Sequence, residues 1–183
     1  MFLVFLFLLI YSYLVFLSTL VVFNRYEIPP KIEPDRKLVV VIAAWNEEQN
    51  LEETIRSIFK ARNTQNIERL LIGDDGSTDS SISILEKLKL EFPELSVEKY
   101  ERIGKPNIIN SLIEKYSLNT DEYNIVFMDA NISIDERCFE ELENLISRKG
   151  IGIVGASIKP KNEESNMESD YILRENHIKF NES

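Results

Sequence analysis

Apolar strand-like runs alternate with helical patterns along the middle of the chain, and this alternation limits the possible folds most narrowly. The first run, residues 38–44, is a continuous Val-rich stretch of the kind found in strands that are buried on both faces. Further strands are expected at residues 67–72, 96–101, 123–128 and 151–156, and helices at 50–61, 79–91, 106–116 and 133–147. Strands that alternate with helices in this way predict an α/β fold with a doubly wound, mostly parallel sheet.

Local signals mark two of the expected helix starts and one strand end. Asn50 with Glu53, and Ser133 with Glu136, have the spacing of a capping box, in which each side chain bonds the backbone of the other residue. Gly73 near the end of the second strand has no side chain to pack, so it is expected to loosen that end.

The first 23 residues form a separate, uncharged segment in which all but Ser12, Ser18 and Thr19 are apolar. As a helix they would be about 35 Å long at ~1.5 Å per residue, enough to cross a bilayer core of ~30 Å. The segment lacks the basic start and the small-residue cleavage site of a signal peptide. We therefore expect an uncleaved transmembrane helix over residues 1–23, with a buried core helix as the alternative.

The basic residues near this segment all lie on its C-terminal side, and they are Arg25, Lys31, Arg36 and Lys37. Because basic residues favour the cytoplasmic side of a membrane, the globular part is expected in the cytoplasm, with the helix in membrane lipid. Residues 24–37 contain three prolines, which exclude regular helix and sheet, so we expect a juxtamembrane linker there.

Composition excludes several classes of protein. The chain has 183 residues, 21 basic and 31 acidic, with a formal net charge of −10. This acidic balance argues against nucleic acid as a partner, because nucleic-acid binding needs a basic surface. A single cysteine, Cys138, excludes a disulfide framework.

Polar residues follow four of the expected strands, where open α/β sheets bind their ligands. They are Asn46 and Glu47 after the first strand, Asp74 and Asp75 after the second, Lys105 after the third, and Asp129 and Asn131 after the fourth. Each residue type is also a common turn former or helix cap. Because the carboxyl ends of parallel strands share one edge of the sheet, we expect these side chains to face one crevice.

Three of these residues suggest how the crevice could bind a phosphorylated ligand. Asp129 and Asn131 are two residues apart, so in an extended segment they face the same side. Their oxygens could hold a divalent cation, Mg²⁺ or Mn²⁺, and the cation would neutralise a diphosphate leaving group. Lys105 could add a positive charge near the same phosphates. The sequence contains neither the dinucleotide-binding nor the Walker glycine pattern.

The order and composition of these motifs also point to a known family. The motifs are Ala43-Ala44-Trp45-Asn46-Glu47-Glu48, Asp74-Asp75-Gly76-Ser77-Thr78-Asp79, Gly104-Lys105 and Asp129-Ala130-Asn131. Together they resemble the family 2 glycosyltransferases, which have the GT-A fold, a Rossmann-like nucleotide-binding arrangement. The resemblance covers about residues 38–158, and the anchor with a cytoplasmic domain fits the processive polysaccharide synthases of that family.

The resemblance implies roles for the matching positions. Residues 43–47, with Ala43, Ala44, Asn46 and Glu47 as candidates, would line the nucleotide pocket. Asp75 would contact the uracil or the ribose, and Lys105 would lie beside the nucleotide. Asp129 would belong to the Asp-x-Asp motif for metal and diphosphate, with Asn131 in place of the second Asp. Ala43 also stands where the family usually has proline, and the uncharged Asn131 amide should lower the affinity for metal.

The resemblance further implies inverting transfer of a sugar from a nucleotide sugar, UDP-linked by expectation, to a saccharide or lipid-linked acceptor. The family places its acceptor loop and catalytic base after the matched region, and its membrane synthases add a Gln-x-x-Arg-Trp segment that is absent here. Residues 38–158 are therefore expected to be the donor-binding half, and 159–183 the start of an incomplete acceptor half. On this hypothesis the chain is truncated, its catalytic base is unknown, and alone it binds donor with little or no transfer.

Two other functions are consistent with some of these features. A non-catalytic, membrane-tethered module that binds a nucleotide or a partner would have the same strand-end residues. A phosphoacceptor signalling domain would also combine an acidic pair, a separate aspartate and a lysine. The order of motifs argues against the signalling domain, because the acidic pair follows the second strand and Lys105 precedes Asp129.

Overall fold

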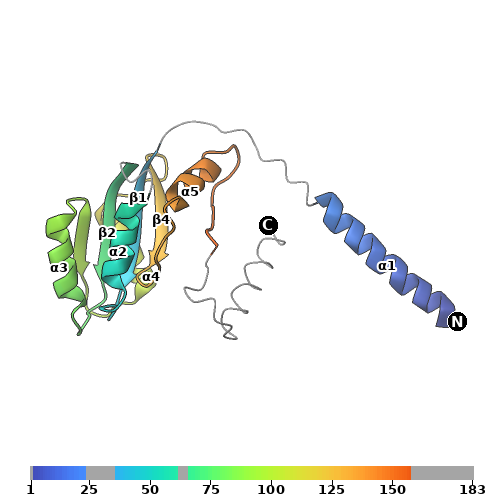
Figure 1. The fold of residues 1–183 in the computed structure, drawn as a ribbon, viewed down its shortest axis with the longest axis horizontal. Helices are drawn as coiled ribbons and strands as arrows, with labels where there is room; N and C mark the ends of the chain where they lie inside the picture. The colour runs from blue at the N-terminus through green and yellow to red at the C-terminus, as the bar shows by residue number, and fades with distance from the viewer. Residues whose placement is uncertain (1, 24–35, 62–65, 158–183) are drawn as a thin grey trace. The chain divides into compact units, whose positions relative to one another are not determined.

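The computed structural model describes residues 2–23, 36–61 and 66–157 of the chain. The chain forms two compact units, and residues 31–154 make up the unit that contains the sheet. Its elements are β1 (Lys37–Ala44), α2 (Leu51–Lys60), β2 (Ile67–Asp74), α3 (Ser81–Glu91), β3 (Leu95–Lys99), α4 (Lys105–Lys115), β4 (Tyr123–Asp129) and α5 (Cys138–Ile146) (Figure 1). The expected alternation of strands and helices is confirmed as far as the helix after the fourth strand.

The four strands form one parallel sheet in the order β3-β2-β1-β4. From β1 the chain moves outward through β2 to β3, and then returns past β1 to place β4 on the other side. This confirms the expected parallel α/β sheet, and it puts a change of winding direction between β1 and β4. In such sheets, ligands bind beyond the strand ends at this change of direction.

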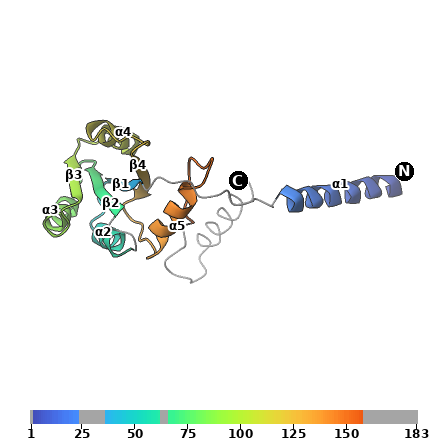
Figure 2. The same cartoon turned by 90° about the horizontal axis from the view of Figure 1, so that it is seen from above.

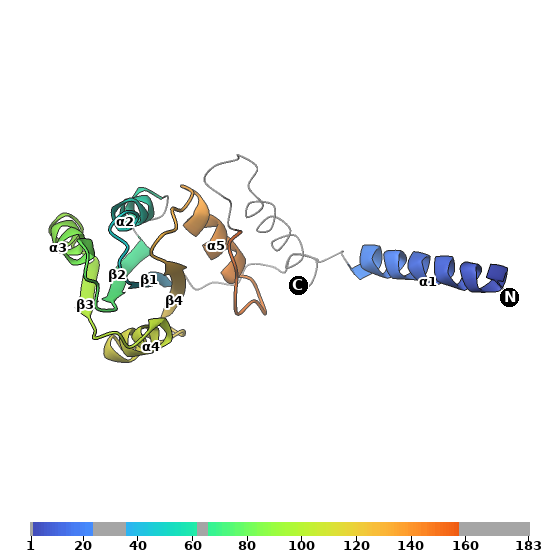
Figure 3. The ribbon, with the colours of Figure 1, turned by 90° about the horizontal axis from the view of Figure 1, so that it is seen from below.

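Helices cover both faces of the sheet, as the views along it show (Figures 2 and 3). Val39 and Val41 of β1 pack toward α4, whereas Val40 and Ile42 join the core beneath α2, α3 and α5. Residues 38–42 are at most 1% exposed, so neither face of β1 meets water. This double burial explains why the strand is a continuous apolar run without polar alternation.

Gly73 does not loosen the end of β2, contrary to the sequence-based expectation. It is paired on both sides within the sheet, with Ala43 and with Glu98. A Cβ atom at this position would lie 2.2 Å from Cγ2 of Ile108, a fully buried residue of α4. The glycine therefore permits α4 to lie close against the sheet.

The two expected capping boxes are not formed at the helix starts. Asn50 precedes α2, but its side chain makes no cap and instead donates to Oε2 of Glu47 at 3.3 Å. Helix α5 begins at Cys138 and not at Ser133. The physical reason is a turn at Asp135, whose side chain accepts the backbone N–H of Arg137 at 2.9 Å and delays the helix.

The fifth expected strand, residues 151–156, is not a strand in the structure. Within the described ranges, the sheet contains only β1 to β4, and Ile153 is 91% exposed. A strand needs a hydrogen-bonded neighbour, and the two glycines at 152 and 155 weaken the segment further.

The N-terminal segment forms helix α1 (Phe2–Phe23), whose described side chains, at residue 4 and residues 6–16, are exposed. In the part of the chain that the structure describes, no helix is long and apolar enough to cross a membrane. The transmembrane anchor over residues 1–23 stays a prediction. The expected linker and acceptor-half start, apart from residues 36 and 37, lie outside the described residues.

Glu98 of β3 ties the sheet to the end of α4, and it predicts a pH dependence of stability. Its carboxylate lies 2.5 Å from Nζ of Lys115 and accepts the hydroxyl of Tyr116 at 2.8 Å. The hydrogen bond with Lys115 holds the pKa of Glu98 below its ordinary value of 4.5. A depressed pKa stabilises the fold above the unfolded pKa, and the gain is lost as pH falls through the folded pKa.

We therefore expect Glu98→Gln to lower the free energy of unfolding at pH 7 by about 1 kcal/mol or less. The difference from wild type should shrink as pH falls below 4.5 and disappear once pH is below the lowered pKa of Glu98 in the folded state. Urea unfolding at a series of pH values measures it, with the exposed Glu94→Gln as the matched control. An equal difference at pH 7 and in acid would contradict the prediction.

Candidate functional site

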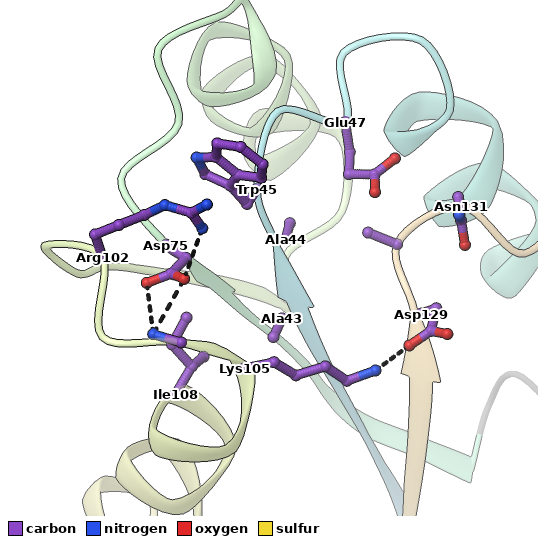
Figure 4. A pocket seen from close by; sticks show the side chains of 12 residues that line it. Ala43, Ala44, Trp45, Glu47, Asp75, Arg102, Lys105, Ile108, Asp129 and Asn131 are labelled. Carbon is purple, nitrogen blue, oxygen red and sulfur yellow. Dashed lines mark hydrogen bonds and ion pairs between the residues drawn. The ribbon is translucent and has the colours of Figure 1, made fainter.

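A pocket of about 370 Å³ opens at the carboxyl ends of β1, β2 and β4, where α4 begins (Figure 4). It lies at the change of winding direction, as expected for an open α/β sheet. Two of the residues that the sequence singled out, Asn46 and Asp74, are not part of its lining, and Oδ2 of Asp74 instead accepts the backbone N–H of Ser77 at 3.0 Å. The other candidates line it, and they are Ala43, Ala44, Glu47, Asp75, Lys105, Asp129 and Asn131. The structure thus brings together residues that are up to 88 positions apart in the sequence.

Asp75 forms a buried acceptor at one end of the pocket. Its side chain is only 6% exposed, and both carboxylate oxygens accept the backbone N–H of Gly104, at 3.2 and 3.1 Å. Nη1 of Arg102 donates to Oδ2 at 3.1 Å. Because a carboxylate can accept about four hydrogen bonds, Asp75 can still accept a donor from a ligand.

Arg102 and Trp45 form the wall beside Asp75. The guanidinium carbon of Arg102 lies 3.4 Å from the centroid of the Trp45 ring, in a cation–π contact. Arg102 has a positive φ of 51°, in the left-handed region that non-glycine residues seldom adopt. The flat guanidinium and indole together offer a surface on which a planar base can stack.

Lys105 and Asp129 form an ion pair at the other end of the pocket. Lys105 is the first residue of α4, and its side chain reaches toward Asp129 at the end of β4 (Figure 4). Both side chains are 53% exposed, so a ligand in the pocket can reach either one. This end therefore carries one positive and one negative group, at the position where strand and helix ends meet.

Asn46 lies outside the pocket lining because its side chain holds two loops together. Its Oδ1 accepts the backbone N–H of Thr78 at 2.8 Å, and its own N–H donates to Oγ of Ser77 at 2.9 Å. Its φ is +52°, a conformation that asparagine tolerates better than most residues. The structure thus gives Asn46 a positioning role, and a direct contact with nucleotide stays a prediction.

Asp79 continues the same connection between the loops. Its carboxylate accepts the backbone N–H groups of Glu48, at 3.1 Å, and of Ser81, at 3.0 Å. Desolvation raises the pKa of Asp79, but the hydrogen bonds from Ser81 and Glu48 outweigh it, so the net pKa lies below the ordinary value. The Asp-Gly-Ser-Thr-Asp part of the motif therefore holds the loop after β1 in place through these hydrogen bonds.

The donor atoms near Asp129 fit a hard divalent cation. Asp129 and Asn131 contribute a carboxylate and an amide oxygen to the same pocket wall (Figure 4). Oxygen ligands of this kind suit Mg²⁺ and Mn²⁺, which usually keep several waters or phosphate oxygens as further ligands. Among the described residues, no group of three His, Cys, Asp or Glu could hold a metal, so a cation here would need ligands from elsewhere.

Sequence reasoning missed two residues that shape the pocket, Arg102 and Ile108, and it gave Gly104 no role beyond its place in the Gly104-Lys105 motif. Arg102 and Gly104 were not obvious because they act through Asp75, which is 27 and 29 positions away. Ile108 could not be found from the sequence, because its place depends on how α4 packs on Gly73.

Comparison with known proteins identifies a family. Residues 39–182 match the sequence model of "Glycosyl transferase family 2". Among curated relatives, the poly-beta-1,6-N-acetyl-D-glucosamine synthase of Staphylococcus aureus is 23% identical over 129 residues. That match covers 70% of this chain and 30% of the relative, so the chain spans about a third of the length of the curated relatives that it matches.

Two solved structures show the same fold. A mannosyltransferase from Pyrobaculum calidifontis, solved with GDP-Man and Mn²⁺, has a TM-score of 0.62 at 18% identity, covering 88% of this chain and 46% of its own. TarS residues 1–349 of S. aureus, solved with UDP-GlcNAc, has a TM-score of 0.52 at 20% identity, covering 68% of this chain and 38% of its own. These values establish a shared α/β fold.

Proposed function

The chain belongs to glycosyl transferase family 2, and from this membership we propose that it binds a nucleotide-sugar donor, with UDP as the expected nucleotide. The sugar would be transferred, with inversion at the anomeric carbon, to a saccharide or lipid-linked acceptor. The observation that carries the proposal is the pocket at the strand ends, which joins Asp75, Lys105 and Asp129.

The Asp75 end of the pocket suits the nucleoside part of the donor. Asp75 can accept an N–H from the base or a hydroxyl from the ribose. Its buried position and its bonds from Gly104 and Arg102 hold the carboxylate in one orientation. The Trp45–Arg102 wall offers a flat surface beside it. These features support a nucleoside site without fixing which base it takes.

The Lys105 and Asp129 end suits the diphosphate. Lys105 can donate to phosphate oxygens. Asp129, with Asn131, would hold a divalent cation, and such a cation when bound would neutralise charge on the departing diphosphate. The P. calidifontis mannosyltransferase was solved with Mn²⁺, and so was GalNAc-T7, which has a TM-score of 0.54 at 22% identity. These neighbours favour Mn²⁺ as the first metal to test.

The role of this chain in the reaction follows from these two ends. Asp75 and Arg102 would fix the nucleoside while Lys105 and Asp129 hold the diphosphate side, so the sugar would be presented at the pocket mouth. Fixing a reactant in one orientation removes part of the entropic barrier to transfer. An acceptor hydroxyl would then attack the anomeric carbon, as its proton passes to a base and the bond to the diphosphate breaks.

Trp45 allows the proposal to be tested directly. It is the single tryptophan of the chain and it lines the pocket, so its fluorescence should report a bound nucleotide. We expect UDP to change this fluorescence saturably. The affinity for UDP should be higher with Mn²⁺ than without it. Asp75→Asn should weaken UDP binding about 10-fold or more. The substitution replaces one acceptor oxygen with an NH2 donor, which cannot accept the hydrogen bonds that Gly104 and Arg102 donate.

The exposed Asp121→Asn, which lies outside the pocket lining, is the matched control and should bind UDP as wild type does. Thermal melting of each variant shows that the fold is retained. A folded wild-type chain whose fluorescence does not respond to UDP, with or without Mn²⁺, would contradict the proposal.

A non-catalytic module that binds a nucleotide or a partner is the second candidate, and the comparisons do not favour it. The curated relative is a synthase, and the P. calidifontis neighbour is a mannosyltransferase. Because residues 1–183 alone are expected to bind donor with little or no transfer, the distinguishing measurement is made on the native protein as isolated. A transferase moves labelled sugar from UDP-GlcNAc to an oligosaccharide, whereas a pure binding module releases no UDP.

A further inference from the structure

The Lys105–Asp129 ion pair places a positive charge where the proposed cation would bind. The Lys105 ammonium contacts Oδ1 of Asp129, the same carboxylate that would be the charged metal ligand. We propose that this ion pair must open before the cation binds, and that the donor's diphosphate opens it, so that Lys105 makes nucleotide binding and cation binding depend on each other. The inference rests on the proposed function and adds an order and a coupling to it.

The first step of the argument is electrostatic. A divalent cation and an ammonium group that share one carboxylate repel each other strongly at such short separation. Asn131 brings no charge to offset this repulsion, because its amide oxygen is neutral. In the described part of the chain, no cluster of three acidic, His or Cys residues supplies the missing charge. The cation alone should therefore bind weakly while Lys105 stays on Asp129.

The second step is that a diphosphate gives Lys105 another partner. The side chain is 53% exposed, so it can leave Asp129 without burying an unpaired charge. Its backbone, in contrast, is held in place, because the N–H of the preceding residue, Gly104, is bonded to Asp75. Lys105 can then turn from Asp129 to a phosphate in the same pocket while α4 stays where it is.

The third step is the linkage between the two ligands. Nucleotide that draws Lys105 away from Asp129 raises the affinity for cation, and by thermodynamic reciprocity the cation raises the affinity for nucleotide equally. A lysine that served only as a phosphate ligand would behave differently. Its removal would weaken nucleotide binding and would not improve cation binding.

Removal of the Lys105 charge tests the inference by binding measurements. Free Mn²⁺ is followed by electron paramagnetic resonance in the full chain, with and without saturating UDP. We expect Lys105→Met to bind Mn²⁺ alone at least about fivefold tighter than wild type, because Asp129 is released. The increase in Mn²⁺ affinity caused by UDP should be at least about fivefold smaller in Lys105→Met than in wild type. Association of Mn²⁺ with UDP in solution is the same for both proteins and cancels in this comparison.

Lys99→Met is the matched control, because Lys99 is 55% exposed and paired with Glu86 outside the pocket lining. It changes the net charge equally and should match wild type within about twofold. If Lys105→Met binds Mn²⁺ alone no tighter than wild type, the inference is overturned although the proposed function stands. If wild type binds neither UDP nor Mn²⁺, the proposed function fails first, and the inference with it.

Discussion

Replacement of Asp129 by alanine is expected to weaken Mn²⁺-dependent binding of UDP by at least about 100-fold, because loss of a mere outer-shell partner already costs 10–100-fold in metal affinity. Asp129 and Asn131 are the two proposed metal ligands, and only Asp129 is charged. Asn131 therefore cannot replace the lost carboxylate. Titration of UDP with and without Mn²⁺, followed by Trp45 fluorescence, measures the effect.

Without metal, the same substitution is expected not to weaken UDP binding. Asp129→Ala frees Lys105 from its ion pair, so UDP alone should bind at least as tightly as it does to wild type. Asp121→Ala, at an exposed position outside the pocket lining, should leave both measurements unchanged. If Mn²⁺ still strengthens UDP binding to Asp129→Ala as much as to wild type, Asp129 is not a metal ligand.

Replacement of Gly73 by alanine is expected to destabilise the fold by about 1–3 kcal/mol, the usual cost of overpacking a filled core. The new methyl group would lie 2.2 Å from Cγ2 of Ile108, and Tyr100 and Leu112 are within 3.3 Å on the same side. Relief of this contact requires α4 to move away from the sheet. Because α4 begins with Lys105, UDP binding should weaken together with stability.

A double-mutant cycle with Ile108→Ala separates this contact from a general effect of alanine in a strand. Ile108→Ala removes the methyl group that the new Cβ meets, so the two changes together should cost less than their sum. Gly152→Ala is the control, because no atom lies within 4 Å of its Cβ position. Strict additivity in urea unfolding, or a normal stability of Gly73→Ala, would show that α4 does not depend on the glycine.

The middle of the chain was predictable because burial on both faces leaves a direct trace in the sequence. Residues 38–42 are apolar without interruption, as a central strand covered by helices on both sides requires. The pocket residues were predictable for a related reason. Strand ends in a parallel sheet meet at one edge, so Asp75, Lys105 and Asp129 could be assigned to one crevice before any contact was known.

Errors arose where local signals compete with the rest of the fold. The Asn50 and Ser133 capping boxes have the correct spacing, but other hydrogen bonds form instead. The Asn50 side chain bonds to Glu47, and Asp135 accepts the backbone N–H of Arg137. The expected strand at 151–156 has an apolar pattern, yet within the described ranges it has no paired neighbour. A strand depends on its partner, and its own sequence does not contain that partner.

By itself, then, the sequence determined the parallel α/β class, the edge of the sheet where the pocket opens and most of the residues that line the pocket. These depend on periodicity and chain order, which are properties of the sequence alone. Only the tertiary structure decided the role of Gly73, the positioning role of Asn46, the contact of Arg102 with Asp75 and the pairing of Lys105 with Asp129. Each of these depends on distances between atoms that are far apart along the chain, and packing of the helices on the sheet sets those distances.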